Sequence, residues 1–158
     1  MRRFRVPRGV FSIVKEVARH LIRRPVVGIA AAARTADGRW LLVRRADVDE
    51  WALPGGTLEW GETFQQSIAR ELSEEAGVDR CENVRLLGVF SRPDRDPRLH
   101  AVTVLVECLI DPPVRAPSNP LEISEARLFA TEELPASLAM GMDDMLRVAI
   151  DGKSGVLE

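Results

Sequence analysis

Three glutamates fall within one helical turn of each other in residues 63–76. At 100° per residue, Glu71 and Glu75 lie about 40° apart around a helix, with Glu74 about 60° to the other side of Glu71. No lysine or arginine stands three or four residues from Glu71 or Glu75, and Arg70 can pair only with Glu74. Carboxylates clustered in this way suit a hard divalent cation, Mg²⁺ or Mn²⁺. The alternative interpretation is a solvated acidic helix face.

The preceding loop adds to this acidic cluster. Glu59 and Glu62 lie in it, so the folded segment gathers up to five carboxylates. Gly55 and Gly56 stand in the same loop, and the absence of a Cβ atom lets their backbone approach a ligand closely. The loop and the helix together therefore predict a cation site.

The elements that must position these groups follow from hydrophobic spacing. Phe64, Ile68, Leu72 and Ala76 recur every four residues, and Gly77 ends the helix. Turn residues 36–38 join the first two expected strands into a hairpin, and a proline-rich break spans residues 112–120. Strands are expected at residues 26–34, 39–45, 84–90, 99–110 and 126–130, and a second helix at about residues 137–150.

Composition indicates one soluble domain in the cytoplasm. The 158 residues are 46% hydrophobic and 29% charged, with a mean hydropathy of −0.07, a balance that excludes a largely disordered chain and a polytopic membrane protein. The longest apolar run, residues 26–33, is far shorter than the roughly 20 residues of a membrane-spanning helix. Charged residues interrupt residues 10–22, which disfavours a secretion signal. Cys81 and Cys108 lack the spacing of a metal clip, and both are expected to be reduced.

The N-terminal segment differs in charge from the rest of the chain. Residues 1–24 hold eight basic residues and one glutamate, so the remainder carries the acidic excess behind the net charge of −2. Residues 1–25 are interpreted as a basic amphipathic helix and residues 26–158 as the main domain. The helix could contact an anionic membrane or a nucleic acid, but packing on its own domain or on a second subunit is favoured. A homodimer is therefore expected, with no membrane partner.

The region around the three glutamates resembles a known family signature, the Nudix box of the Nudix hydrolases. The residues that carry the resemblance are Gly56, Glu62, Arg70, Glu71, Leu72, Glu74, Glu75, Gly77 and Val78. The resemblance covers about residues 26–150. It implies an α/β/α sandwich with a mixed sheet, to which the N-terminal helix is added.

The resemblance also implies an activity and roles for individual residues. The expected reaction is a Mg²⁺- or Mn²⁺-dependent hydrolysis of a nucleoside diphosphate linked to a further group. Arg70 and Glu62 would pair to hold the loop against the helix. The metal ligands would be Glu71, Glu74 and Glu75, with the Gly56 carbonyl as a further one.

One carboxylate must serve as the general base that activates water. Glu71 is a candidate because it precedes the glutamate pair by one turn. Glu122 or Glu125, which follow the proline-rich break, are the others. Glu125 is counted with the three box glutamates as catalytic, and the choice among the candidates stays open.

The segment after the box bears on the substrate. Residues 91–100 include an Arg-Asp-Pro-Arg tetrad and are similar to the corresponding segment of Nudix ADP-ribose pyrophosphatases. Its arginines could grip phosphates or stack on adenine, or they could pair with neighbouring aspartates. Trp51 could stack on a base or brace the Pro-Gly-Gly turn. The candidate substrate-binding residues are Arg44, Arg45, Trp51, Arg92, Arg95 and Arg98.

The leading hypothesis is an enzyme that cleaves ADP-ribose or a related nucleoside diphosphate sugar into a nucleoside monophosphate and a sugar phosphate. The alternatives are a pyrophosphohydrolase of oxidised nucleoside triphosphates and a non-catalytic nucleotide-sensing module. Processing of RNA 5′ ends is disfavoured because the chain has no tyrosine and only 5% aromatic residues, which leaves few stacking platforms for single strands.

Overall fold

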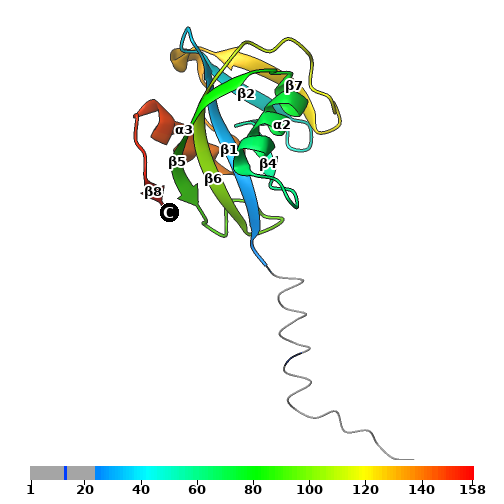
Figure 1. The fold of residues 1–158 in the computed structure, drawn as a ribbon, viewed down its shortest axis with the longest axis vertical. Helices are drawn as coiled ribbons and strands as arrows, with labels where there is room; N and C mark the ends of the chain where they lie inside the picture. Colours follow the sequence, from blue (N-terminus) through cyan, green and yellow to red (C-terminus); the bar gives the residue numbers. More distant parts are fainter. Residues whose placement is uncertain (1–12, 14–23) are drawn as a thin grey trace, which may run out of the picture.

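The computed structural model describes residue 13 and residues 24–158 (Figure 1). The expected helix of residues 1–25, and the dimer contact assigned to it, lie almost entirely outside the described residues. Within the part of the chain that is described, no helix is both long enough and apolar enough to cross a membrane. Cys81 and Cys108 are both free, as the sequence predicted.

The described residues build one mixed β-sheet. Its strands are β1 (Val26–Thr35), β2 (Trp40–Arg45), β3 (Trp51–Ala52), β4 (Gly55–Thr57), β5 (Cys81–Phe90), β6 (Ala101–Ile110), β7 (Ile123–Phe129) and β8 (Val156–Leu157). The spatial order is β3-β2-β1-β6-β5-β8, with β4 paired to β1 and β7 paired to β2. β1 pairs in parallel with β6, and β5 in parallel with β8, whereas the other pairs are antiparallel.

The expected hairpin of β1 and β2 forms, but its strands soon separate. They are paired at Arg34 and Trp40, next to the turn. Further along β1 the partner is β4, through residues 28–30, and the Ala31 amide donates to the Pro54 carbonyl at 2.9 Å. The segment around Pro54 thus lies between the two strands. This insertion delivers Gly55 and Gly56 to the middle of the sheet.

The helix that carries the three glutamates is α2 (Phe64–Ala76). Thr63 caps its N-terminus, because the side-chain oxygen accepts from the Gln66 amide while the Gln66 side chain accepts from the Thr63 amide. Gly77 ends the helix in a left-handed conformation, with φ of 63°. Both boundaries agree with the sequence pattern.

The second helix is shorter than expected. The structure forms α3 (Met142–Ile150) after two 3-10 turns, η1 (Thr131–Glu133) and η2 (Ala139–Gly141). Within η2, Met140 has a φ of 56° and Gly141 a φ of 62°. These left-handed residues cannot continue a right-handed helix, so α3 begins after them.

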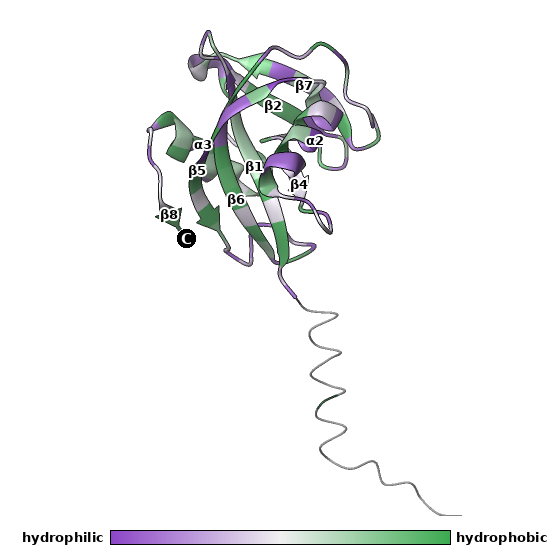
Figure 2. Cartoon of the chain, viewed as in Figure 1, coloured by the Kyte–Doolittle hydropathy of each residue, from purple (hydrophilic) through white to green (hydrophobic). Residues whose placement is uncertain are grey.

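α2 and α3 cover opposite faces of the sheet, which confirms the α/β/α sandwich (Figure 1). Figure 2 shows hydrophobic residues concentrated along the central strands and hydrophilic residues in the outer loops. β1 serves both layers: Ile29, Ala31 and Ala33 belong to the core beneath α2, whereas Ala30 and Ala32 belong to the core beneath α3. A strand covered on both faces is apolar throughout, which explains the uninterrupted run predicted to be a strand.

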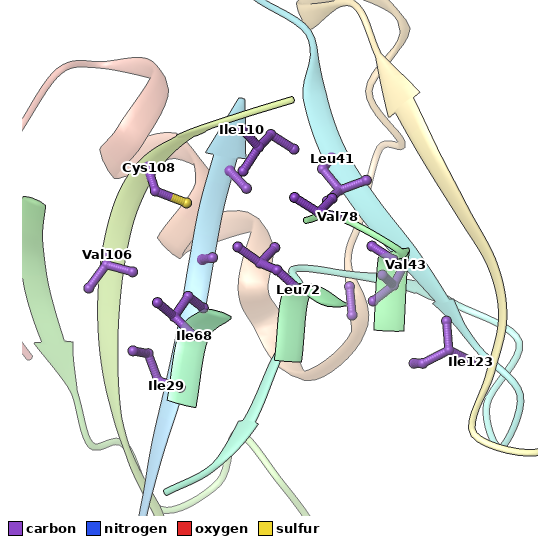
Figure 3. Close-up of a cluster of buried hydrophobic side chains, with 14 of the residues drawn as sticks. Ile29, Leu41, Val43, Ile68, Leu72, Val78, Val106, Cys108, Ile110 and Ile123 are labelled. Carbon is purple, nitrogen blue, oxygen red and sulfur yellow. The ribbon is translucent and has the colours of Figure 1, made fainter. Parts of the chain in front are cut away.

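The core beneath α2 fixes the acidic helix in place. Ile68 and Leu72 point from α2 toward β1, β2 and β6, where they meet Ile29, Leu41 and Val106 (Figure 3). Leu72 is fully buried, and truncating such a leucine to alanine typically costs about 2–5 kcal/mol. Glu71 and Glu75 lie along the edge of this buried face, whereas Glu74 is exposed.

Candidate functional site

Two adjoining cavities lie beside the loop that precedes α2 and beside the face of α2 that carries the glutamates. The larger has a volume of 850 Å³ and lies where β1, β4, residues 91–100 and the η2 turn meet. The smaller, of 330 Å³, is lined by Glu71, Glu74, Glu75 and Glu122, together with Ser118, Asn119 and Ile123. Glu71 and Glu122 line both cavities. An acidic compartment therefore opens onto a larger one.

The acidic compartment concentrates negative charge in a partly dry setting. Burial, reinforced by the charges of Glu71 and Glu122, raises the pKa of Glu75 to about 8, although the Gly55 amide donates to its Oε2 at 2.8 Å. Glu71 is 8% exposed. Burial raises its pKa as well, and Glu74 and Glu122 add to the rise while Arg70 opposes it. This compartment is short of positive charge.

Arg70 supplies part of the missing charge from the rim. Its Nε and Nη2 donate to the two Glu62 oxygens at 2.7 and 3.0 Å, which ties the loop to the helix. Its Nη1 donates to Glu71 Oε1 at 2.9 Å and lies 3.5 Å from Glu74 Oε2. One guanidinium thus serves three carboxylates.

Gly56 lies against the Glu71 carboxylate. A Cβ atom built at this position would be 2.3 Å from Glu71 Oε1, so any side chain there displaces that group. The sequence proposed Gly56 for its carbonyl oxygen, and the structure shows in addition why the residue lacks a side chain. The Glu71 carboxylate therefore occupies the space that a side chain at position 56 would need.

The donor set around the smaller cavity suits a divalent cation. Within the described residues, no three acidic, histidine or cysteine side chains are already grouped closely enough to hold a metal as they stand. Four carboxylates nevertheless line one small cavity, and two of them have raised pKa values. Hard oxygen donors with excess negative charge are the chemistry that Mg²⁺ and Mn²⁺ require, so the residues present fit such an ion.

Glu122 lies at the two cavities, whereas Glu125 lies away from them. The amide of Ser118, in the proline-rich loop, donates to the Glu74 carbonyl at 2.7 Å, and the amide of Glu122 donates to the Asn119 carbonyl at 3.1 Å, which brings Glu122 to the cavities. Glu125 pairs with Arg44 in the sheet register and lines neither cavity. The structure therefore brings Glu122, and not Glu125, to the three α2 glutamates.

The candidate substrate-binding residues separate into two groups. Arg45 and Arg98 line the larger cavity. Arg98 donates through Nε and Nη2 to the buried Asp96 carboxylate at 3.0 and 2.8 Å, and Arg45 donates to Asp47 at 2.8 Å. Each guanidinium is thus held at the cavity by a neighbouring carboxylate.

The other four candidates do not line either cavity. Arg44 is paired with Asp49 at 2.8 Å. Trp51 packs edge-to-face on Phe129, with ring centroids 4.9 Å apart, in the layer of α3. Arg92 pairs with Asp94 at 3.0 Å, and the Arg95 side chain is only 7% exposed. The partners of these four side chains are other groups of the protein, away from the two cavities.

Sequence reasoning missed the apolar wall of the larger cavity. Met140, Met142, Leu99 and Ala101 contribute to it, and of these only Leu99 falls in a segment that the sequence had marked. The position of the methionines depends on the left-handed η2 turn, which no local pattern predicts. Apolar walls with a few polar groups are typical of small-molecule sites.

Comparison with known proteins relates this geometry to a family. A model of the NUDIX domain matches residues 23–149. An ADP-ribose pyrophosphatase of Methanocaldococcus jannaschii is 33% identical over 124 residues, which are 75% of this chain and 70% of that protein.

Two further matches are a solved structure and a shorter sequence match. The structure of an ADP-ribose pyrophosphatase from Streptococcus suis superposes with a TM-score of 0.67 at 25% identity, covering 85% of this chain and 97% of that one. A putative 8-oxo-dGTP diphosphatase of Bacillus subtilis is 42% identical over 53 residues, which are 34% of this chain and 35% of that protein.

Proposed function

This chain belongs to the NUDIX family of hydrolases, and from that premise we propose that it hydrolyses the pyrophosphate linkage of ADP-ribose or a related nucleoside diphosphate sugar. The products are a nucleoside monophosphate and a sugar phosphate. The reaction uses Mg²⁺ or Mn²⁺. The observation that carries the proposal is the acidic cavity opening onto a larger one with guanidinia and an apolar wall.

The two cavities suit the two parts of such a substrate. A volume of 850 Å³ is within the range of roughly 300–1,000 Å³ typical of small-molecule sites. Arg45 and Arg98 offset phosphate charge, while Met140 and Met142 provide an apolar surface for a base or sugar. The pyrophosphate is then next to the carboxylates that Glu71 and Glu122 present to both cavities.

Individual residues have separate roles in the proposed reaction. Glu71, Glu74, Glu75 and the Gly56 carbonyl would hold the divalent cation, which would neutralise phosphate charge and lower the pKa of a water. Arg70 holds Glu71 through the 2.9 Å hydrogen bond to its Oε1. Glu122 accepts the proton of the attacking water. It is favoured over Glu125 because it lines both cavities.

A substrate panel tests this proposal. ADP-ribose, other nucleoside diphosphate sugars and nucleoside triphosphates are incubated with the protein and Mg²⁺, and the products are identified by mass spectrometry. We expect AMP and ribose 5-phosphate from ADP-ribose. The Glu74→Gln variant should show no measurable turnover, because a proposed cation ligand is lost. Full activity of that variant would refute the assigned site.

A second candidate is hydrolysis of oxidised nucleoside triphosphates. The similarity to the putative 8-oxo-dGTP diphosphatase favours it, although that match covers 34% of this chain. The same panel separates the two candidates. Turnover of 8-oxo-dGTP without cleavage of ADP-ribose would establish this alternative.

The assembly proposed for the protein is a cytoplasmic homodimer formed through residues 1–24. Its support is the basic amphipathic pattern of that segment. Sedimentation should show that the full chain is a dimer and that a chain lacking residues 1–24 is a monomer. An activity assay should give the same turnover for both. Loss of RNA binding on the same deletion would favour a nucleic-acid arm.

A further inference from the structure

We infer that Glu158 and Arg95 form a positioning link that holds two walls of the larger cavity in place, and this inference rests on the proposed function. Neither residue lines that cavity. Both lie beside it, where β8 runs along β5 and the chain ends next to the loop of residues 91–100 (Figure 1).

Arg95 is the centre of the link. Its side chain is 7% exposed, and its guanidinium lies 5.5 Å from the centroid of the Phe90 ring. Nη1 donates to the Gly141 carbonyl at 2.6 Å, while Nε and Nη2 donate to the Glu158 carboxylate. A single buried guanidinium thus joins the loop, the η2 turn and the C-terminal segment.

Glu158 ties the beginning of the loop to the same point. Its Oε2 accepts from the Ser91 amide at 3.1 Å, from the Arg92 amide at 3.0 Å and from Arg95 Nε at 3.1 Å. The Glu158 amide donates to the Val89 carbonyl at 3.0 Å, so β5 fixes the residue. The hydrogen bond from Arg95 lowers the pKa of Glu158 to about 2, and the carboxylate stays ionised at neutral pH.

The first wall held by this link is the loop itself. Asp96 and Arg98 lie one and three residues after Arg95, and both line the cavity. Asp96 Oδ1 accepts from the Arg98 amide at 2.9 Å, which makes a compact turn. Fixing Arg95 therefore fixes where the Arg98 guanidinium meets the substrate.

The second wall is the η2 turn. Gly141 stands between Met140 and Met142, which both line the cavity. Met140 has a φ of 56°, a left-handed conformation that a side chain rarely adopts, and the hydrogen bond from Arg95 to the Gly141 carbonyl supports this turn. A Cβ atom on Gly141 would be 3.0 Å from Arg95 Nη1, so the two groups are closely fitted.

The metal-binding carboxylates lie outside this link. The contacts of Arg95 and Glu158 are with β5, the loop, η2 and α3, and none is with α2. Loosening the link should therefore weaken substrate binding and leave the chemical step largely intact. This separation distinguishes a positioning role from a general loss of structure.

The test compares Glu158→Gln with wild type and with Glu132→Gln. Glu132 is exposed in η1 and offers the same chemical change away from the cavity. For the substrate that wild type turns over best, we expect Glu158→Gln to raise KM on the order of tenfold, because small displacements of binding groups have large effects. We expect kcat to stay within about twofold and Glu132→Gln to match wild type.

Hydrogen exchange supplies a readout that needs no substrate. The Ser91 and Arg92 amides should exchange faster in Glu158→Gln, while the amides of α2 keep their wild-type rates. If Glu158→Gln fails to fold, Arg95→Lys replaces it. A lysine keeps the charge and much of the aliphatic stem, but its single nitrogen cannot reproduce the guanidinium fork that bridges Gly141 and Glu158. It should raise KM in the same way.

The outcomes separate this inference from the proposed function. If wild type turns over no member of the panel, the proposed function fails, and the inference fails with it. If wild type is active and the two variants have the KM of Glu132→Gln, only the positioning role is overturned. A fall in kcat at unchanged KM would also overturn it, because the link would then act on the chemical step.

Discussion

Two arginine-centred clusters adjoin the larger cavity, and they differ in how completely their charges are matched. Arg95, whose side chain is nearly buried, and Arg92 face Glu158 and Asp144, so two guanidinium groups meet two carboxylates. Arg70 faces Glu62, Glu71 and Glu74, and Glu75 and Glu122 add their charges to the same region. No ion pair among the described residues includes these last two. The charges of the Arg95 cluster are matched, whereas the α2 cluster keeps an excess of negative charge that a cation can neutralise.

The difference in charge indicates a difference in role. A buried ion pair whose remaining lone pairs and protons are satisfied holds segments together. Carboxylates kept close without matching cations repel each other, and such strain is typical of sites completed by a ligand. The pKa of Glu158 is lowered to about 2 whereas that of Glu75 is raised to about 8. We therefore regard the Arg95 cluster as scaffold and the α2 cluster as the reactive site.

Among the changes that contrast the two clusters, Glu75→Gln has the largest expected effect on activity. Losing a cation ligand removes several kcal/mol of transition-state stabilisation, so kcat/KM should fall about 10³-fold. The free energy of unfolding without metal should not fall, because the substitution relieves repulsion with Glu71 and Glu122. Steady-state kinetics and urea unfolding measure the two quantities. A destabilised variant would show that the cluster is scaffold after all.

Gly56→Ala should lower activity without unfolding the protein, because its added methyl group displaces the Glu71 carboxylate. The new Cβ atom falls 2.3 Å from Glu71 Oε1, the end of a flexible side chain that can move away. We expect activity to drop about 10²-fold, because a misplaced ligand costs this much, with little loss of stability.

Gly61→Ala is the matched control for Gly56→Ala. Gly61 has a φ of 86° and no atom within 4 Å of an added Cβ. Its substitution should lower stability by about 1 kcal/mol through backbone strain and leave kcat/KM unchanged. The reverse pattern would argue against the contact between Gly56 and Glu71.

Adding Mg²⁺ should raise the melting temperature of the metal-stripped protein by about 5–10 °C. A cation at 100 times its Kd stabilises the folded state by about 2.7 kcal/mol, and each kcal/mol is worth roughly 2–4 °C at this chain length. Differential scanning fluorimetry should show this shift in Glu158→Gln but a much smaller one in Glu75→Gln. Equal melting-temperature shifts in the two variants would show that the α2 cluster does not bind the cation.

The smallest effect concerns acid stability. Because the folded-state pKa of Glu158 is lowered from 4.5 to about 2 by Arg95, its contribution to stability is complete above pH 4.5. That contribution is lost as pH falls toward 2. The difference in unfolding free energy between wild type and Glu158→Gln should thus be constant at neutral pH and shrink below about pH 4.5. A difference independent of pH would show that charge plays no part.

The α2 site could be predicted from the sequence because its determinants are local. The spacing of Ile68 and Leu72 set the buried face, Gly77 set the end, and helical geometry then placed the three glutamates together. Gly56 and Glu62 belong to the same short segment. Helical periodicity converts such spacing directly into geometry.

The surroundings of that site were decided by contacts distant in sequence. Arg95 and Arg98 looked equivalent, but Glu158, 63 residues away, holds Arg95 beside Phe90 and leaves Arg98 at the cavity. Glu122 and Glu125 also looked equivalent, but Glu125 pairs with Arg44 in the sheet, whereas the loop that is hydrogen-bonded to α2 brings Glu122 to the cavities. The sequence alone determined the helix, its caps and its acidic face, since these depend on neighbours within a few turns. Only the tertiary structure decided which loop side chains reach the cavity, because strand register and long-range ion pairs set their direction.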